Sequence, residues 1–236
     1  MNKTDIQIEF NQRDRDVYVQ RIASGLKPGT TVLDVGAGQG RYRDYFKHCV
    51  YKTQDFEQYR GDTKDFQGET WTYAQLDYVS DITAIPVPDA SFDFILCTEV
   101  LEHVPEPIKA IKEMARILKK GGMILLTAPL GSGLHQQPYH FYGGFTRFFY
   151  EKYFPENGLK IRELKPNGGF LKHFAQESAR VADWLVSAEQ LEKWSIKKQF
   201  IRFVFRFLIP RFVIKKDAKD FLEDFTVGYF VLGIKN

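Results

Sequence analysis

The alternation of apolar and polar residues divides the chain into a regular first half and a less regular second half. Between Thr31 and Pro129, short apolar runs alternate with segments of helical periodicity, a pattern that is typical of parallel βαβ units. The run 92–98, Phe-Asp-Phe-Ile-Leu-Cys-Thr, is almost continuously apolar, as expected of a strand buried on both faces. The pattern predicts strands over residues 31–36, 51–56, 72–79, 92–98 and 123–128.

Two helices are expected between these strands. One begins at Arg41 and includes Phe46, and the other covers residues 105–120. In the second helix, polar residues separate apolar ones at helical spacing, namely Ile108, Ile111, Ala115 and Leu118. Gly121 and Gly122 follow, and we expect them to end this helix because glycine is common just after a helix C-terminus.

The second half of the chain predicts a connection, a short helix and two further strands. The connection 130–145 is rich in Gly, His and Tyr, and a helix is expected around residues 146–154. Strands are expected over 159–164 and 226–234, with an inserted helical segment between them. We therefore expect one domain over residues 1–236, built from a helical lead-in over 1–30, a core over 31–169, a helical insertion over 170–225 and a last strand over 226–236.

Composition narrows the choice of function classes. Of 236 residues, 44% are hydrophobic and 27% are charged, as in an ordinary globular protein. The net charge of +3 is too small to indicate a nucleic-acid partner, and we expect none. Cys49 and Cys97 form no C-x-x-C pair, so neither a structural zinc site nor a disulfide framework is indicated. Because no signal-peptide core follows Met1 and no apolar run reaches about 18 residues, we expect a cytoplasmic protein.

The first expected strand runs directly into a glycine-rich loop, Gly36-x-Gly38-x-Gly40. Glycines let the backbone approach a ligand closely, so this strand, loop and helix favour a nucleotide-type ligand over a simple tight turn. The dinucleotide fingerprint G-x-G-x-x-G needs its third glycine at the position of Arg41. The carboxylate of Asp34, before the loop, suits the ammonium group of an amino-acid moiety. Both features disfavour a nicotinamide dehydrogenase.

Three motifs in order resemble a known family. The segment 32–40, Val-Leu-Asp-Val-Gly-Ala-Gly-Gln-Gly, resembles the first motif of class I S-adenosylmethionine-dependent methyltransferases, the type 11 group in particular. Residues 91–104 and 116–129 resemble the family's fourth-strand and fifth-strand motifs, and the resemblance is close over 28–130. It implies S-adenosyl-L-methionine as the cofactor and S-adenosyl-L-homocysteine as the product. It also implies a Rossmann-like α/β three-layer sandwich with a seven-stranded, mostly parallel sheet of order 3-2-1-4-5-7-6, whose last strand is antiparallel.

The same resemblance implies which residues contact the cofactor. They follow the expected strands and are Asp34, Gly36, Ala37, Gly38, Gly40, Asp55, Phe56, Asp81, Ile82, Thr98 and Glu99. The glycine loop would line the methionine end, and Asp55 would accept hydrogen bonds from the ribose hydroxyls. Asp81 would bind the adenine amino group, and Thr98 and Glu99 would lie beside the sulfonium. The alternative for Asp55 is a carboxylate that only stabilises a turn. The alternative for Asp81 is a structural role, because a second aspartate, Asp77, lies nearby.

Candidate catalytic residues follow the strands 92–98 and 123–128. A hydroxyl acceptor must lose its proton, and histidine is the usual base near neutral pH. The candidate bases are His103, His135 and His140, with a structural role as the alternative for each. Tyr139 and Tyr142 are expected to bind the acceptor, because loops on a rigid scaffold often carry binding residues.

A metal site is the alternative use of part of this region. Glu99, Glu102 and His103 form a Glu-x-x-Glu-His array, similar to one that some quinone-biosynthesis O-methyltransferases use with Mg²⁺. Imidazole suits Mg²⁺ less well than carboxylate does. We therefore expect no metal ion, with Mg²⁺ at these residues as the alternative.

The acceptor is indicated only by the second half of the chain. Residues 129–144 and 165–173 resemble bacterial methyltransferases that are associated with surface-polysaccharide biosynthesis. This favours O-methylation of a hydroxyl on a sugar, a glycolipid or another polyhydroxylated acceptor, free or lipid-linked. The alternative is a methyltransferase for a quinone-like, phenolic or other small metabolite.

Residues 195–216 combine basic and aromatic side chains. On a helix, Lys198, Arg202 and Arg206 align and leave a wide Phe, Ile and Leu face. A helix of this kind can lie peripherally on an anionic membrane surface, here the inner face of the membrane. The alternative, which the pattern slightly favours, is that the apolar face covers the sheet or a dimer partner. The oligomeric state stays open.

Overall fold

The structure, a computed structural model, describes residues 10–61, 71–188, 195–217, 219 and 221–236. These residues form two compact units. Residues 18–165 and 228–236 form the α/β unit, and residues up to 17 together with 166–227 form the helical unit. The expectation of one domain over the whole chain stays a prediction, and residues 1–9 of the expected lead-in lie outside the described residues.

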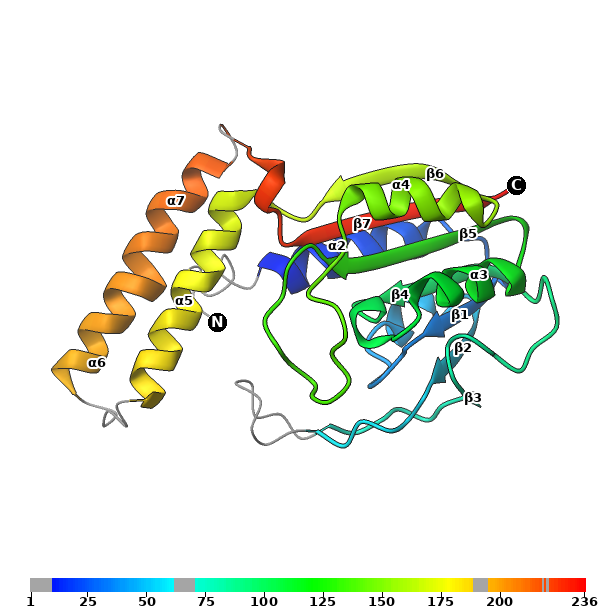
Figure 1. The fold of residues 1–236 in the computed structure, drawn as a ribbon, viewed down its shortest axis with the longest axis horizontal. Coiled ribbons are helices and arrows are strands. Elements are labelled where there is room, and N and C mark those ends of the chain that lie inside the picture. The colour runs from blue at the N-terminus through cyan, green and yellow to red at the C-terminus, as the bar shows by residue number, and fades with distance from the viewer. Residues whose placement is uncertain (1–9, 62–70, 189–194, 218, 220) are drawn as a thin grey trace. The chain divides into compact units, whose positions relative to one another are not determined.

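The α/β unit is built on one seven-stranded sheet. Its order is β3-β2-β1-β4-β5-β7-β6; β1 to β5 pair in parallel, and β7 is antiparallel to β5. The expected strand order and the antiparallel last strand are therefore confirmed (Figure 1). The strands are β1 (Thr31–Val35), β2 (Val50–Asp55), β3 (Tyr78–Val79), β4 (Phe92–Thr98), β5 (Leu118–Pro129), β6 (Leu159–Pro166) and β7 (Gly228–Lys235).

Helices cover both faces of the sheet. They are α2 (Phe10–Ser24), of which residues 18–24 belong to this unit, η1 (Arg43–Phe46), η2 (Leu101–His103), α3 (Pro107–Ile117) and α4 (Arg147–Glu156). One apolar core includes Leu33 and Val35 and packs against α3 and α4. The other includes Val32 and packs against η1 and the end of α2, because successive side chains of β1 point to opposite faces. The three-layer sandwich is confirmed.

Two elements are shorter than the pattern predicts. The helix expected from Arg41 is only the 3₁₀ turn η1, because the chain turns back after Phe46 and starts β2 at Val50. The third strand contains only Tyr78 and Val79. Just before β3, the Asp77 carboxylate accepts a hydrogen bond from the backbone N–H of Thr53 in β2. In a regular strand pair a backbone carbonyl oxygen would accept this bond, so the strand does not extend to residue 77.

The glycine pair after α3 lies inside a strand, so the prediction that it ends the helix is wrong. The helix ends at Ile117, and β5 begins at Leu118. Gly121 has a φ of +75°, and a Cβ atom on Gly122 would lie 2.8 Å from the carbonyl oxygen of Lys119. The glycines therefore allow an irregular start of β5, at the point where its register against β4 shifts.

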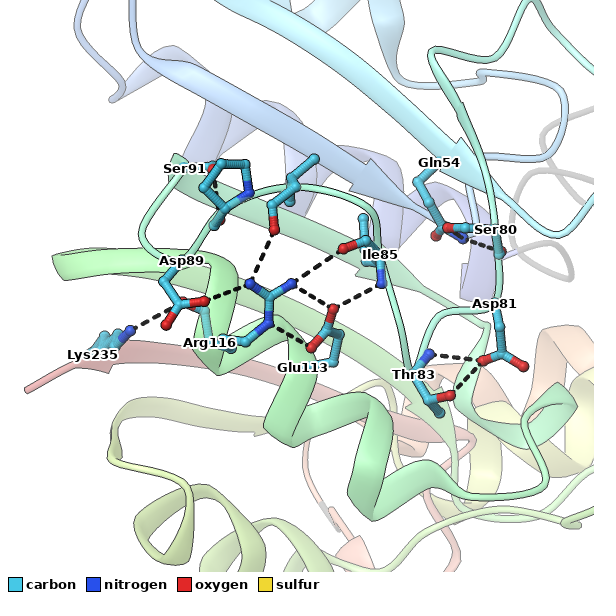
Figure 2. A network of polar contacts seen from close by, with 12 residues as sticks. Gln54, Ser80, Asp81, Thr83, Ile85, Asp89, Ser91, Glu113, Arg116 and Lys235 are labelled. Carbon is cyan, nitrogen blue, oxygen red and sulfur yellow. Dashed lines mark hydrogen bonds and ion pairs between the residues drawn. The ribbon is translucent and has the colours of Figure 1, made fainter.

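Arg116 fixes the connection between β3 and β4 (Figure 2). Its guanidinium donates to both carboxylate oxygens of Glu113, at 2.7 and 2.8 Å, and to Asp89 at 2.6 Å. It also donates to the carbonyl oxygens of Ile85 and Val87, at 3.1 and 3.0 Å. The Arg116 hydrogen bonds lower the pKa of Glu113. This network holds in place the connection that carries Asp81 and Ile82.

The helical unit confirms that the insertion before the last strand is helical. Its elements are α5 (Phe170–Ala188), α6 (Ile196–Ile201), the π-helical η3 (Arg202–Leu208), α7 (Ile209–Asp217) and η4 (Glu223–Phe225). Arg206 of η3 forms an ion pair with Asp183 of α5 at 2.5 Å. The alignment of Lys198, Arg202 and Arg206 on one helix face stays a prediction. Within the described part of the chain, no helix is both long and apolar enough to cross a membrane.

Candidate cofactor and acceptor site

The glycine loop follows β1 and depends on each of its three glycines. Gly36, Gly38 and Gly40 have φ values of +69°, +50° and +69°, which other residues rarely adopt. A Cβ atom would lie 2.4 Å from Val100 at Gly36, and 2.8 Å from Trp71 at Gly38. At Gly40 it would lie 2.9 Å from Ala74. Both conformation and space therefore require glycine at these positions.

The loop is tied to the end of β2. The N–H groups of Gly36 and Ala37 donate to the carbonyl oxygen of Gln54, at 2.9 and 3.0 Å. The buried Asp55 carboxylate accepts hydrogen bonds from Gly38 N–H at 2.9 Å and Glu57 N–H at 3.3 Å. Burial raises the pKa of Asp55, and these N–H groups oppose that rise. Asp55 thus lies beside the loop, at the strand end where it was predicted; the ribose role itself stays a prediction.

Asp34 lies deeper than its predicted role suggests. The residue is 2% exposed, and its carboxyl group accepts a hydrogen bond from the Tyr51 hydroxyl of β2. Burial raises the pKa of Asp34 to about 7, and the Tyr51 hydrogen bond limits the rise. Contact with the ammonium group of a ligand stays a prediction, because the structure places this carboxyl against Tyr51 beneath the loop.

An aromatic cluster beside the glycine loop was not predicted from the sequence. Trp71 contacts Tyr59 and Tyr73 edge to face, with ring centroids 5.5 and 6.0 Å apart. The backbone N–H of Ala74 donates to the carbonyl oxygen of Gly38 at 2.9 Å. The signal is the aromatic pair of Trp-Thr-Tyr at 71–73, which adjoins and partly overlaps the predicted strand 72–79. These residues place aromatic rings beside the loop.

The remaining predicted cofactor residues have different surroundings. Asp81 accepts hydrogen bonds from the backbone N–H and the hydroxyl of Thr83, at 2.8 and 2.7 Å, and is exposed, whereas Ile82 is buried. Thr98 ends β4. Glu99 has a φ of +53°, and its carboxylate accepts a hydrogen bond from Thr127 at 2.7 Å. Phe56 packs edge to face on Tyr139, with centroids 5.1 Å apart.

The three candidate bases converge. His103 ends η2, whereas His135 and His140 lie in the connection after β5. The ring centroid of His103 is 4.8 Å from that of His135 and 5.7 Å from that of His140. The rings of His135 and His140 are 4.5 Å apart. The cluster therefore lies at the carboxyl ends of β4 and β5, the edge where ligands bind in open α/β sheets.

Hydrogen bonds and burial set the protonation of this cluster. His103 Nδ1 lies 2.7 Å from the carbonyl oxygen of Tyr139, so this nitrogen carries the proton and Nε2 keeps its lone pair. Burial lowers the pKa of His103 to about 4. Burial also lowers the pKa of His140, whose Nε2 is 3.1 Å from the Ser132 hydroxyl. Both rings are therefore neutral near neutral pH.

A buried carboxylate joins the histidines. Glu102 is 1% exposed, and its Oε1 lies 3.9 Å from His103 Nε2. One ligand atom from each of Glu102, His103 and His135 lies within 4.8 Å of the other two. These three residues differ from the predicted alternative metal site, which contained Glu99 instead of His135. The Glu99 carboxylate accepts a hydrogen bond from Thr127 instead.

The two predicted acceptor tyrosines face different surroundings. Tyr139 contacts Phe56, and its carbonyl oxygen holds His103. Tyr142 donates a hydrogen bond to the carbonyl oxygen of Pro105 at 2.9 Å. It lines a cavity of about 520 Å³ together with Pro105, Glu106, Pro107, Ile108, Lys109, Gly144, Phe145, Phe149 and Tyr153. This cavity lies beside the starts of α3 and α4 and was not predicted.

Sequence comparisons link the chain to methyltransferases. Residues 33–126 match the family model described as a methyltransferase domain. The uncharacterized methyltransferase YcgJ of Bacillus subtilis is 30% identical over 132 residues, 48% of this chain and 49% of that protein. The 2-methyl-6-phytyl-1,4-hydroquinone methyltransferase of Synechocystis is 32% identical over 106 residues, 43% of this chain and 32% of that protein. The chain thus spans half or less of these relatives' length.

Solved structures share the fold. The crystal structure of YcgJ from Bacillus subtilis has a TM-score of 0.55 and 17% identity, over 95% of this chain and 99% of that one. Phosphoethanolamine N-methyltransferase 2 of Haemonchus contortus, in complex with S-adenosyl-L-methionine, has a TM-score of 0.53 and 17% identity, over 94% of this chain and 52% of that one. At this identity the likeness shows the fold alone.

Proposed function

We propose that the chain is an S-adenosyl-L-methionine-dependent methyltransferase that methylates a hydroxyl of a sugar, a glycolipid or another polyhydroxylated acceptor. The methyltransferase class is supported by the match over residues 33–126 and by the printed names of the relatives. The observation that carries the acceptor chemistry is the convergence of His103, His135 and His140 at the carboxyl edge of the sheet.

The residues of the glycine loop fit the cofactor. Gly36, Gly38 and Gly40 leave a surface without side chains, and Asp55 lies beside it at the end of β2. These residues would hold S-adenosyl-L-methionine, which supplies an activated methyl group when bound. The protein's part is to align the acceptor oxygen with the methyl carbon and to exclude water, because positioning supplies much of the rate.

The histidine cluster supplies the proton acceptor. As the acceptor oxygen bonds to the methyl carbon, the carbon–sulfur bond breaks and its electron pair stays on sulfur, giving S-adenosyl-L-homocysteine. The hydroxyl proton passes to an imidazole, and a neutral ring is required for this step. His103 and His140 meet that requirement, because burial lowers the pKa of each.

The alternative acceptor is a quinone-like or phenolic metabolite. It is supported by the relative named a 2-methyl-6-phytyl-1,4-hydroquinone methyltransferase, which matches this chain over 106 residues. A phenol has a lower pKa than a sugar hydroxyl and depends less on a base. Loss of an imidazole should therefore affect the two acceptor classes differently.

The function is tested by transfer of a labelled methyl group from S-adenosyl-L-methionine to sugar nucleotides, lipid-linked sugars and hydroquinones. We expect transfer to a sugar hydroxyl, and a loss of about 10²-fold or more in kcat in His140→Ala. His48→Ala is the control, because His48 is an exposed residue after η1 and should keep full activity. Transfer to hydroquinones alone would overturn the sugar acceptor.

We also infer that the helical unit contacts an anionic membrane surface and brings the enzyme to a lipid-linked acceptor. Large apolar side chains on α6, η3 and α7 are exposed; Phe200 and Phe212, for example, are 66% and 65% exposed. Exposed basic residues, Lys197, Arg202, Arg211, Lys215 and Lys216, lie among them. A second copy of this surface would bring like charges together, whereas anionic lipid headgroups neutralise them.

A further inference from the structure

We propose that Glu102, His103 and His135 bind a divalent transition-metal ion at the carboxyl edge of the sheet. Two ligands come from η2, between β4 and α3, and the third comes from the connection after β5. Binding of the ion does not depend on methyl transfer; only its use in holding an acceptor oxygen rests on the proposed function.

The two imidazoles are prepared as ligands. The Nδ1 atoms of His103 and His135 lie 2.7 and 2.9 Å from the carbonyl oxygens of Tyr139 and Gly133. A carbonyl only accepts, so Nδ1 is the donor in each ring, and Nε2 is the nitrogen left to bind a metal ion once it carries no proton. Metal-binding histidines usually donate their other N–H to a carbonyl or a carboxylate, which fixes the ring and its tautomer. Both rings have this arrangement.

The potential ligand atoms are spaced almost as closely as the ligands of one metal ion. With metal–ligand bonds of about 2.0–2.2 Å, two ligands of one ion lie roughly 3 to 4 Å apart. Glu102 Oε1 and His103 Nε2 are 3.9 Å apart, and one donor atom from each of the three residues lies within 4.8 Å of the others.

Charge also favours a cation at this point. Glu102 is 1% exposed, and the two neighbouring side chains of the set are imidazoles. A carboxylate attracts a cation more strongly where water is excluded. A divalent ion bound by Glu102 and the two imidazoles would gain from this attraction.

The donor set selects the class of metal. Imidazole suits Zn²⁺, Fe²⁺ and Co²⁺, whereas Mg²⁺ and Ca²⁺ prefer oxygen ligands. Three protein ligands leave a position open, as in catalytic rather than structural zinc sites. An acceptor oxygen fits that position. His140, whose ring is 4.5 Å from that of His135, is then the imidazole that accepts the proton.

Titration of the full chain with Co²⁺ after chelator treatment tests this site. Calorimetry should show one bound ion per chain, with a visible Co²⁺ absorption spectrum that Zn²⁺ abolishes by competition. His135→Ala and, separately, His135→Gln should weaken Co²⁺ binding at least about tenfold. His48→Ala, at an exposed histidine outside the cluster, is the control and should bind Co²⁺ as the wild type does.

Three results would overturn the proposal: no Co²⁺ binding by the wild type, unchanged binding in both folded His135 variants, or displacement of Co²⁺ by equimolar Mg²⁺. Circular dichroism shows whether each variant is folded. The measurement uses neither cofactor nor acceptor, so it separates the two proposals. A chain that binds Co²⁺ but transfers no methyl group contradicts only the proposed function, and the reverse result contradicts only the metal site.

Discussion

Asp34 shows how burial changes the behaviour of a single side chain. The residue is 2% exposed, and burial raises the pKa of its carboxyl group from 3.8 to about 7. The folded state therefore binds more protons than the unfolded state between these values. The contribution of Asp34 favours folding below a pH of about 4 and is lost as the pH rises through about 7.

The first prediction follows from this sign. In Asp34→Asn the titrating group is absent, while the side-chain oxygen still accepts the Tyr51 hydrogen bond. Relative to the wild type, the unfolding free energy of the variant should increase as the pH rises from about 4 to about 7. Urea unfolding at several pH values measures this difference. A constant difference between variant and wild type would contradict the buried, protonated carboxyl.

The residues of the site differ in how far the sequence predicts them. The need for Gly36, Gly38 and Gly40 is visible locally, because their spacing after an apolar strand indicates the loop. The contact of Gly38 with Trp71 is not, since the two residues are far apart in sequence and meet only in the fold. The meeting of Glu102 with His135 is hidden for the same reason.

Elements were predictable where burial alone determines them. The bounds of β4, Phe92–Thr98, agree with the apolar run that predicted it, because both faces of this strand are buried. The helix expected at Arg41 fails because too little chain is left before β2, and β3 is short because Asp77 replaces a strand carbonyl. In both cases the position of the neighbouring strand β2 decides the length of the element, whereas hydrophobic periodicity reports only the local sequence.

The exposed apolar face of α6, η3 and α7 leads to a prediction at the scale of elements. We expect the chain to float with vesicles that contain anionic lipid at low salt, and to remain unbound with neutral vesicles or at high salt. Phe200→Ser combined with Phe212→Ser should weaken this binding at least about tenfold, because two large apolar side chains are lost.

Phe148→Ser is the matched control for this experiment. Phe148 is 70% exposed but lies on α4 of the α/β unit, so its loss should leave flotation unchanged. Absence of flotation of the wild type with anionic vesicles at low salt would contradict the membrane contact. Equal loss in the control variant would contradict its assignment to α6, η3 and α7.

At the scale of the whole molecule, the two units have separate tasks in this account. The α/β unit contains the glycine loop, the histidine cluster and the matched residues 33–126. The helical unit lies outside that match and contains the exposed aromatic and basic residues. Cofactor chemistry is therefore supported by comparison with other proteins, whereas the acceptor and the membrane depend on features of this chain.

Calorimetric titration with S-adenosyl-L-homocysteine, S-adenosyl-L-methionine and NAD tests the central claim most directly. We predict one binding site for each sulfur ligand and no binding of NAD. Gly38→Ala should lose at least about tenfold in affinity, because φ is +50° and a Cβ atom would lie 2.8 Å from Trp71, whereas Gly25→Ala should bind normally, since its nearest contact is 3.4 Å away. A folded wild-type chain that binds neither sulfur ligand would contradict the account.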